Sequence, residues 1–255
     1  MRRFIVVSGF LAVFFIVAED PASAHQPLTT QDAQPVPVHR IQFESGVHYL
    51  DYPGGNEAYH LEMEMNYGLI DNLDLGVEIP FISYDAKHGE DADVVGDVVV
   101  KSKLLFLKGR EGDPISLTFQ PFVKLPTADE KKYPRSTGES DLGFVLIGTR
   151  NLHPVLAHLN VGYTLVNGTT PQGDEYDNVF GFKIALEYVE DPRYQVVGEL
   201  AGETNRTPGE DDYFSLLVGG RYLWVKNVTL DAGVALGLSD ASPDFRSMVG
   251  VTTKF

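Results

Sequence analysis

Apolar and polar residues alternate one for one along residues 61–68, which read LEMEMNYG. In a β-strand, successive side chains point to opposite faces, so this stretch would have one apolar and one polar face. Met63 and Met65 would share the apolar face with Leu61. The same alternation on a helix would scatter its apolar side chains around the axis. The stretch therefore predicts a strand with an apolar environment on one face and water on the other.

Segments with this two-residue period recur from Arg40 to the end of the chain. Their lengths match the roughly 9–11 residues that cross a bilayer at a tilt, and exceed the usual 5–6 of a globular strand. The predicted strands cover residues 40–50, 57–67, 73–84, 97–107, 115–125, 141–150, 157–166, 178–189, 194–203, 213–225, 228–238 and 245–255. An even number is typical of bacterial outer-membrane barrels. We therefore predict an all-β fold, a transmembrane antiparallel up-and-down β-barrel of about 12 strands.

The connectors between the predicted strands are of two alternating kinds. One set is mostly long and acidic, as at residues 85–95 and 126–139. The other set is mostly short, as at residues 190–193 and 225–227. Outer-membrane barrels have long extracellular loops and short periplasmic turns. With an even strand count, both termini would lie on the side of the short turns.

Aromatic residues gather near the ends of the predicted strands, on the face that carries the apolar residues. Outer-membrane barrels have such girdles at both lipid–water interfaces. Near the long connectors the girdle would comprise Tyr49, Tyr59, Phe81, Phe180, Phe214 and Phe245. Near the short connectors it would comprise Tyr67, Phe106, Tyr188, Tyr194, Trp224 and Phe255. A soluble sandwich or a lipocalin-like barrel, the alternative fold, would bury its aromatic residues in mid-strand.

The polar faces of the strands would line the lumen, because a charge on the lipid face costs about 2–4 kcal/mol near the midplane. The residues predicted to line it are Glu62, Glu64, Asp74, Glu78, Lys101, Lys103, Lys124, Asp141, Lys183, Glu187, Glu199, Glu203, Arg221, Asp231, Arg246 and Lys254. The turns suggest that Arg221 lies opposite Asp231, and Lys183 near Glu199. Twelve strands leave both a narrow pore and a lumen closed by ion pairs open, since eight strands fill their interior and 16–18 leave a channel.

The first 24 residues have the pattern of a secretory signal peptide. A basic start precedes an apolar run at residues 4–18, and Ala22 and Ala24 have the spacing of a cleavage site. We therefore predict cleavage before His25 and export from the cytoplasm. An uncleaved membrane anchor is the alternative, but a spanning helix needs about 20 apolar residues, and the charges of Glu19–Asp20 end this run earlier.

Residues 25–39 are polar and proline-rich without any period, and we predict that they form a flexible periplasmic leader. Residues 40–255 then form the barrel as one domain. The chain contains no cysteine, which excludes disulfides and thiol chemistry. Its net charge of −16 argues against nucleic acid as a partner, since nucleic-acid binding requires a basic surface.

Patterns for catalysis or metal binding are weak. His60, Glu62 and Glu64 share one strand face, as polar residues on any such face do, and we predict no metal there. The acidic loops at 89–93 and 209–212 lack the spacing of a calcium loop and are interpreted as solvated charge near lipopolysaccharide. The sequence has neither a GxSxG motif nor a glycine-rich phosphate loop. We therefore predict no enzyme, no catalytic residue and no cofactor.

Four stretches resemble the outer-membrane family named for the MetA pathway of phenol degradation, whose members are called transporters. They are VKLPTAD (123–129), ALEYVEDPRYQVVGELAGET (185–204), VGGRYLWVKNVTLDAGVALGLSD (218–240) and SPDFRSMVGVTTKF (242–255). Phe255 is similar to the terminal signal that the outer-membrane assembly machinery binds.

The resemblance implies a barrel in the outer membrane of a Gram-negative bacterium, in contact with lipid and lipopolysaccharide. It also implies passive uptake of small hydrophobic or aromatic solutes, and it supplies no catalytic residue. A closed structural or surface-interaction barrel stays open as an alternative. An outer-membrane hydrolase is a further alternative, although no serine and histidine stand in clear register.

Overall fold

A computed structural model describes residues 24–85, 91–110, 115–128 and 136–255 of the chain. The predicted signal peptide, apart from Ala24, and part of the acidic loop at 89–93 lie outside the described residues. The strands are β1 (Ile41–Tyr52), β2 (Asn56–Ile70), β3 (Leu73–Asp85), β4 (Ala92–Val95), β5 (Val98–Leu107), β6 (Ile115–Leu125), β7 (Asp141–Leu152), β8 (Val155–Leu165), β9 (Val179–Asp191), β10 (Tyr194–Glu203), β11 (Tyr213–Val225), β12 (Val228–Gly237) and β13 (Phe245–Lys254).

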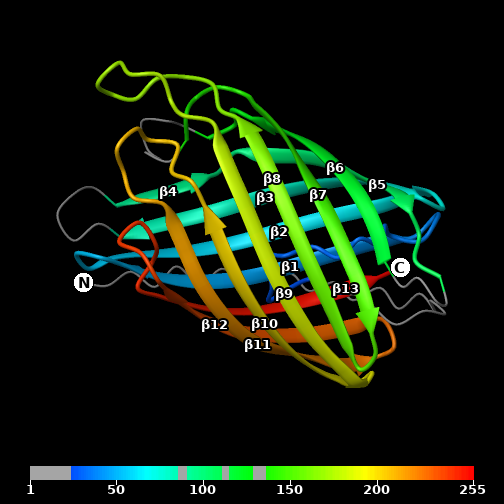
Figure 1. Ribbon diagram of the computed structural model, residues 1–255. Helices are drawn as coiled ribbons and strands as arrows, with labels where there is room; N and C mark the ends of the chain where they lie inside the picture. Colours follow the sequence, from blue (N-terminus) through cyan, green and yellow to red (C-terminus); the bar gives the residue numbers. More distant parts are fainter. Residues whose placement is uncertain (1–23, 86–90, 111–114, 129–135) are drawn as a thin grey trace.

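The strands form one closed antiparallel sheet (Figure 1). Each main strand pairs with its neighbours in sequence, and the first strand, β1, pairs with the last, β13. The short strand β4 and strand β5 both pair with β3, at Phe81–Tyr84 and at Leu73–Glu78 respectively, so they act as one interrupted strand. The described residues thus form a closed barrel of twelve strands, which confirms the predicted fold.

Most strand bounds agree closely with those predicted from the alternation. Strands β6, β10 and β11 cover the predicted residues, whereas β2 extends to Ile70 at the end that carries a short turn. The additional strand β4 lies within a connector that was predicted to be a loop. Its four residues extend the pairing of β3 beyond the break at Gly96–Asp97, because β3 is longer than β5.

The barrel carries its apolar side chains outward, the reverse of a water-soluble protein. On β11, Leu216 and Val218 are exposed on the outer wall, while Leu217 between them is fully buried. On β2, Met65 is 52% exposed and its neighbour Glu64 is 6% exposed. This arrangement explains the alternation at residues 61–68, because the carboxylates lie inside the barrel and Met65 faces outward.

The aromatic residues assigned to the two girdles lie at the strand ends. Tyr59, Tyr67, Phe81, Phe106, Phe180, Tyr188, Tyr194, Phe214 and Trp224 are exposed, and Tyr49, Phe245 and Phe255 are half-buried. Two pairs contact each other across neighbouring strands, with ring centroids 5.3 Å apart for Tyr49–Tyr59 and 5.1 Å apart for Tyr194–Tyr222. The exposed rings therefore contribute to the outer wall near its rims.

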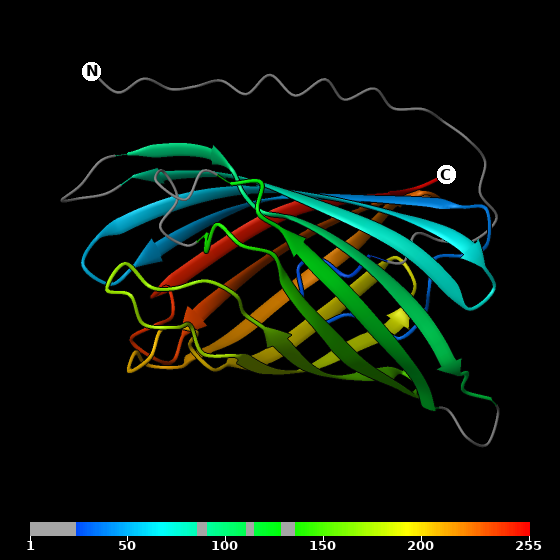
Figure 2. The same cartoon turned by 90° about the horizontal axis from the view of Figure 1, so that it is seen from above.

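Residues 25–39, which we call the inner segment, lie within the barrel (Figure 2). Leu28 packs in a buried cluster with Ala185, Val197, Leu217, Ala235 and Met248. A side chain on Gly219 would place its Cβ 2.6 Å from the ring of Pro27, so glycine is required where the inner segment touches the wall. This position differs from the free periplasmic leader predicted from composition. The physical reason is that strand side chains supply hydrogen bonds that the segment cannot make with itself.

Candidate functional site

The carboxylate of Glu199 on β10 is the strongest single anchor of the inner segment. It accepts hydrogen bonds from the backbone N–H groups of Thr29 and Thr30, at 2.7 Å and 2.6 Å. It also accepts both threonine hydroxyls, at 2.9 Å and 2.6 Å. Hydrogen bonds to a charged acceptor are about twice as strong as neutral ones. Glu199 therefore satisfies two backbone donors and two hydroxyls in the middle of the lumen.

Arg221 on β11 holds the start of the inner segment. Its Nε donates to the backbone oxygen of Gln26 at 2.6 Å, and its Nη2 donates to the backbone oxygen of His25 at 2.5 Å. Its Nη1 lies 2.8 Å from Glu187 of β9, which balances the charge. One buried guanidinium thus connects the wall of the barrel to the inner segment.

Further anchors follow the inner segment along its length. Asn160 on β8 forms two hydrogen bonds with the backbone of Gln31, at 2.7 Å and 2.9 Å. Ala33 donates to Thr149 Oγ1 at 2.8 Å and accepts from Thr118 Oγ1. The partners come from β6, β7, β8, β10 and β11, so the inner segment is bound to much of the barrel circumference.

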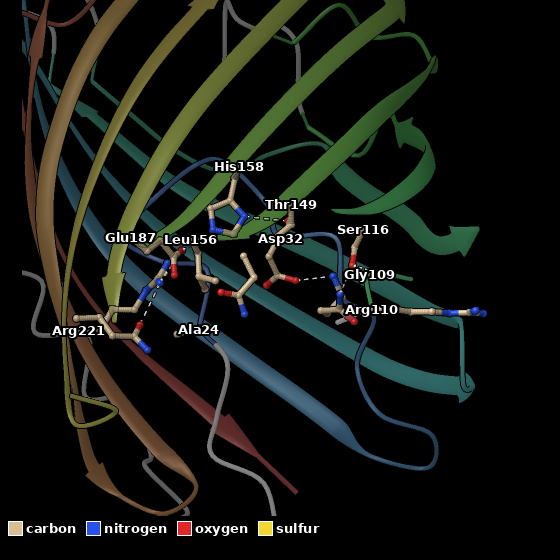
Figure 3. A pocket seen from close by; sticks show the side chains of 13 residues that line it. Ala24, Asp32, Gly109, Arg110, Ser116, Thr149, Leu156, His158, Glu187 and Arg221 are labelled. Atoms are coloured by element: carbon tan, nitrogen blue, oxygen red, sulfur yellow. Dashed lines mark hydrogen bonds and ion pairs between the residues drawn. The ribbon is translucent and has the colours of Figure 1, made fainter. Parts of the chain in front are cut away.

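A cavity of about 580 Å³ lies on the side of the inner segment nearer the short turns (Figure 3). We call it the turn-side cavity. Side chains of both charges line it, among them Asp32 of the inner segment and Arg110. The residues that line it from the strands and the inner segment include Gln34, Ser116, Thr149, Asn151, Leu156, His158, Glu187, Gln195 and Arg221.

A second cavity of about 400 Å³ lies on the side nearer the long loops, and we call it the loop-side cavity. Apolar side chains line it together with charged ones. The apolar lining comprises Leu28, Val99, Phe122, Val145 and Val179. The charged lining comprises Glu62, Glu64, Glu78, Lys101, Lys183 and Glu203, beside His25 and His48.

Strand β8 shows how the inner segment divides the lumen. Leu156 and His158, near the short-turn end of β8, line the turn-side cavity. Gly162 and Thr164, near its long-loop end, line the loop-side cavity. Asn160 lies between them and binds Gln31. The inner segment is therefore a partition across the barrel, with one cavity on each side.

Several predicted lumen residues meet as ion pairs. Lys101 lies 2.8 Å from Glu64 and 3.2 Å from Glu78. Lys124 lies 2.8 Å from Asp141 and 3.2 Å from Asp97. Buried pairs of this kind cancel charge that would otherwise face the lumen.

Of the two cross-strand pairs suggested by the turns, one is present in register and the other is offset by two residues, and neither forms an ion pair. Arg221 lies opposite Asp231, as predicted, yet its guanidinium binds Glu187 and the inner segment instead. Lys183 lies opposite Ala201, two residues from Glu199, and its Nζ donates to the backbone oxygen of Thr29 at 3.2 Å. Both cations instead bind the backbone of the inner segment, whose position the turns do not indicate.

The other predicted lumen residues have varied surroundings. Asp74 accepts the backbone N–H of Val36 at 2.8 Å, and Glu62 lies 3.6 Å from His48. Glu203 lines the loop-side cavity at the rim and is exposed. Lys254 is buried, and Lys103 and Arg246 are half-buried.

Sequence reasoning missed the residues at the start of the inner segment and their partner on β1. Glu44 is fully buried, and its Oε2 lies 2.9 Å from His25 Nδ1. The alternation along β1 places Glu44 on the same inner face as His48, so this signal was present in the sequence. His25 itself gave no signal, because its neighbours have no period.

The pKa of His25 is raised by its surroundings. Burial alone would lower this pKa, because it disfavours the charged ring. The charge of Glu44, the hydrogen bond to it and the charge of Glu64 outweigh the burial, although Lys101 opposes them. The ring is therefore protonated more readily beside Glu44 than a free histidine is.

A threonine–histidine–glutamate row faces the turn-side cavity and bears on the hydrolase alternative. Thr149 Oγ1 lies 2.9 Å from His158 Nδ1, and His158 Nε2 lies 3.5 Å from Glu187. The Thr149 hydroxyl also accepts the backbone N–H of Ala33, so it is held by the inner segment. We therefore interpret this row as part of the anchoring of the inner segment.

The following two statements hold for residues 24–85, 91–110, 115–128 and 136–255. No group of three or more histidine, aspartate or glutamate side chains among them has the arrangement of a metal site. Among the same residues, no helix is long and apolar enough to span a membrane.

Several solved structures similar to this chain are channels or porins. The COG4313 outer membrane channel from Pseudomonas putida F1 has a TM-score of 0.73 and 16% identity, covering 89% of this chain and 100% of that one. The KdgM porin has a TM-score of 0.59 and 11% identity, covering 84% and 99%. The CymD monoaromatic hydrocarbon channel has a TM-score of 0.51 and 8% identity, covering 86% and 89%. At these identities the likeness is one of fold.

A search of curated protein sequences gives no match. Residues 24–255 match the family described as "Putative MetA-pathway of phenol degradation". The match includes the inner segment as well as the barrel. Because this match covers nearly the whole chain, the protein belongs to this family.

Proposed function

We propose that the protein is an outer-membrane channel for passive uptake of small hydrophobic or aromatic solutes. The observation that carries this proposal is the lumen itself, in which two cavities lie on either side of the inner segment. The apolar outer wall suits a lipid environment. Family membership and the similarity in fold to a monoaromatic hydrocarbon channel support the same solute class.

The size and lining of the cavities support small solutes that are not strongly charged. Sites for small molecules are typically about 300–1,000 Å³ and mostly apolar, with a few polar groups. The loop-side cavity has this mixture, because Leu28 and Phe122 line it beside polar groups. Lys101 is already paired with two carboxylates, so less free charge faces a solute there.

The inner segment determines the route between the cavities. A solute that moves from the loop-side to the turn-side cavity has to pass beside this segment or displace it. Conductance should therefore depend on the anchors of the inner segment more than on charges at the rim.

The test is single-channel conductance of the refolded protein in a planar bilayer, with and without a small phenol. Discrete openings that phenol blocks or shifts would support the proposal. Glu203→Ala is the control for Glu199→Ala, because it changes the same strand without removing an anchor of the inner segment. A correctly folded barrel that passes neither ions nor small aromatic solutes, in a liposome uptake assay as well, would overturn it.

A closed structural or surface-interaction barrel is the second candidate, and the buried ion pairs favour it. Lys101 and Lys124 each bind two carboxylates, so part of the charge of the lumen is balanced within the wall without a bound solute. This candidate predicts a silent bilayer even after the inner segment is released. The Glu199 variant described in the Discussion separates the two.

The proposal includes the location and processing of the chain. Export would remove residues 1–24, and Phe255 would present the terminal signal to the outer-membrane assembly machinery. Lipid and lipopolysaccharide would surround the outer wall. Fractionation of cells that express the full chain, with the mass of the purified barrel, tests both statements.

A further inference from the structure

The carboxylate of Glu44 lies at the very start of the inner segment. Its Oε2 accepts the backbone N–H of His25 at 3.3 Å and that of Gln26 at 3.5 Å. The same oxygen lies 2.9 Å from His25 Nδ1. Glu44 has no exposed surface, so water does not share in its solvation. A fully buried carboxylate therefore faces the backbone nitrogen at which signal-peptide cleavage is predicted.

Carboxylates outnumber cations around this point. Lys101 pairs with both Glu64 and Glu78, so the ring of His25 is the cationic partner of Glu44. The other side-chain donors to Glu44 are neutral, from Gln42 at 2.6 Å and Thr252 at 3.3 Å. Asp231 is 6% exposed, and neither of its carboxylate oxygens has a hydrogen-bond partner among the described residues. A buried carboxylate without a partner is unfavourable. One more positive charge near Glu44 would improve the charge balance of this cluster.

Asp231 is close to the same point. A Cβ on Gly250 would lie 2.6 Å from Asp231 Oδ1 and would also meet the side-chain oxygen of Gln26. The side chains of Asp231 and Gln26 therefore both lie above Gly250. The unpartnered carboxylate of Asp231 thus lies next to the residue that follows His25.

We propose that Glu44 is the binding site for the α-ammonium group that cleavage before His25 creates. In that cleavage, water adds across the Ala24–His25 peptide bond. Its hydroxyl goes to the carbonyl carbon of Ala24 and its hydrogen goes to the nitrogen of His25. The new carboxylic acid releases a proton and the new amine takes one up. The nitrogen then carries three N–H donors and a full positive charge in place of one amide N–H.

Processing and docking are therefore linked. The uncleaved chain brings a neutral amide to Glu44, whereas the processed chain brings a cation that forms a charge-assisted hydrogen bond. Ala24 is 6% exposed and lines the turn-side cavity, so its removal also leaves room beside the new terminus. The inner segment is completed as a partition only after the signal peptide has gone.

The test measures how readily the amino terminus of the purified, folded barrel reacts with 2-pyridinecarboxaldehyde, which modifies free α-amines. Intact mass first establishes the first residue, and a residue other than His25 overturns the proposal. In the folded protein we expect labelling at least about tenfold slower than in urea, since a hydrogen bond to a charged group favours the bound form by about that factor or more. Equal rates in the two states would refute it.

Two variants separate this contact from general stability. Glu44→Gln should restore fast labelling in the folded barrel, whereas Glu64→Gln, which removes a carboxylate from the same cluster, should not. Equal acceleration by both variants would contradict a specific role of Glu44. Two glycines inserted between Ala24 and His25 keep Glu44 and move the amine away, so this barrel should also label fast. A difference in gel mobility between unboiled and boiled samples reports folding independently of any channel activity.

Discussion

Arg221 lies directly opposite Asp231 in the paired strands β11 and β12, yet its guanidinium extends away from Asp231 to Glu187, two strands further around the barrel. The same guanidinium holds two backbone oxygens of the inner segment. Strand pairing therefore fixes the backbone position of Arg221, and the inner segment determines which groups its guanidinium binds. The stability of the partition and the stability of the wall are coupled through one side chain.

Replacement of Arg221 by glutamine should strongly destabilise the barrel. The change leaves Glu187 buried without its cation and removes donors from His25 and Gln26. Breaking a buried pair typically costs about 3–5 kcal/mol of unfolding free energy. The midpoint of heat-modifiable gel mobility measures the effect, with Arg193→Gln on an exposed turn as the control. Equal midpoints for the two variants would show that Arg221 does not anchor the wall.

Replacement of Glu199 by alanine should release the middle of the inner segment. Four hydrogen bonds from Thr29 and Thr30 lose their acceptor. We expect larger and more frequent openings in planar-bilayer recordings, because the partition loses its central anchor. Glu203→Ala changes the same strand at the rim and should leave the recordings as in the wild type. Silence in both variants would favour the closed structural barrel.

Replacement of Gly219 by alanine tests the contact between wall and partition. The added methyl group would lie 2.6 Å from the Pro27 ring and 2.7 Å from the backbone oxygen of Ala232. Overpacking of this kind costs about 1–3 kcal/mol. Gly198→Ala is the matched control, because its Cβ would meet only the Leu217 oxygen at 3.8 Å. Denaturant unfolding should separate the two, and similar midpoints would mean that Pro27 does not pack there.

The anchoring of the inner segment at His25 should weaken as pH rises. The pKa of His25 is raised above its ordinary value of 6.5 in the folded protein, with Glu44, Glu64 and Lys101 facing the ring. Its stabilising contribution is therefore complete below the unfolded pKa and is lost as pH rises through the folded pKa. The difference in thermal midpoint between wild type and His25→Asn should be larger at pH 5 than at pH 9. A difference that grows with pH would contradict the assignment.

The outer wall offers a test of its lipid environment. Val218 is exposed midway along β11, and Val225 is exposed at the short-turn end of the same strand. Lysine at the bilayer midplane costs about 2–4 kcal/mol, falling to about 0–1 kcal/mol near the interface. Val218→Lys should therefore destabilise the barrel in liposomes far more than Val225→Lys. Equal losses would argue that the wall does not face lipid.

Much of the barrel was predictable because each strand repeats one physical rule. The alternation along Ile115–Leu125 or Tyr213–Val225 separates two environments at every residue, so it marks both the strand and its inner face. The brief strand β4 escaped prediction, since four residues inside an acidic connector contain too few alternations. Its pairing depends on the length of β3 and not on its own sequence.

The inner segment could not be predicted from its own residues. Thr29 and Thr30 are polar and lie in a proline-rich stretch, which is typical of a solvated leader. Their partner Glu199 lies about 170 residues away in sequence, and no local pattern links them. For the same reason the partner of Arg221 was not evident, because a third strand and the inner segment both compete with Asp231.

The separation in sequence between the inner segment and its anchors has a consequence for the order of assembly. His25 and Gln26 lie at the start of the inner segment, but Arg221 follows roughly 195 residues later. Contacts between residues so distant form late, since the entropy of closing a long loop has to be overcome first. We therefore expect the first residues of the inner segment to be among the last to form their final contacts. On this argument the lumen stays open until the last strands pair, and the inner segment divides it only at the end of assembly.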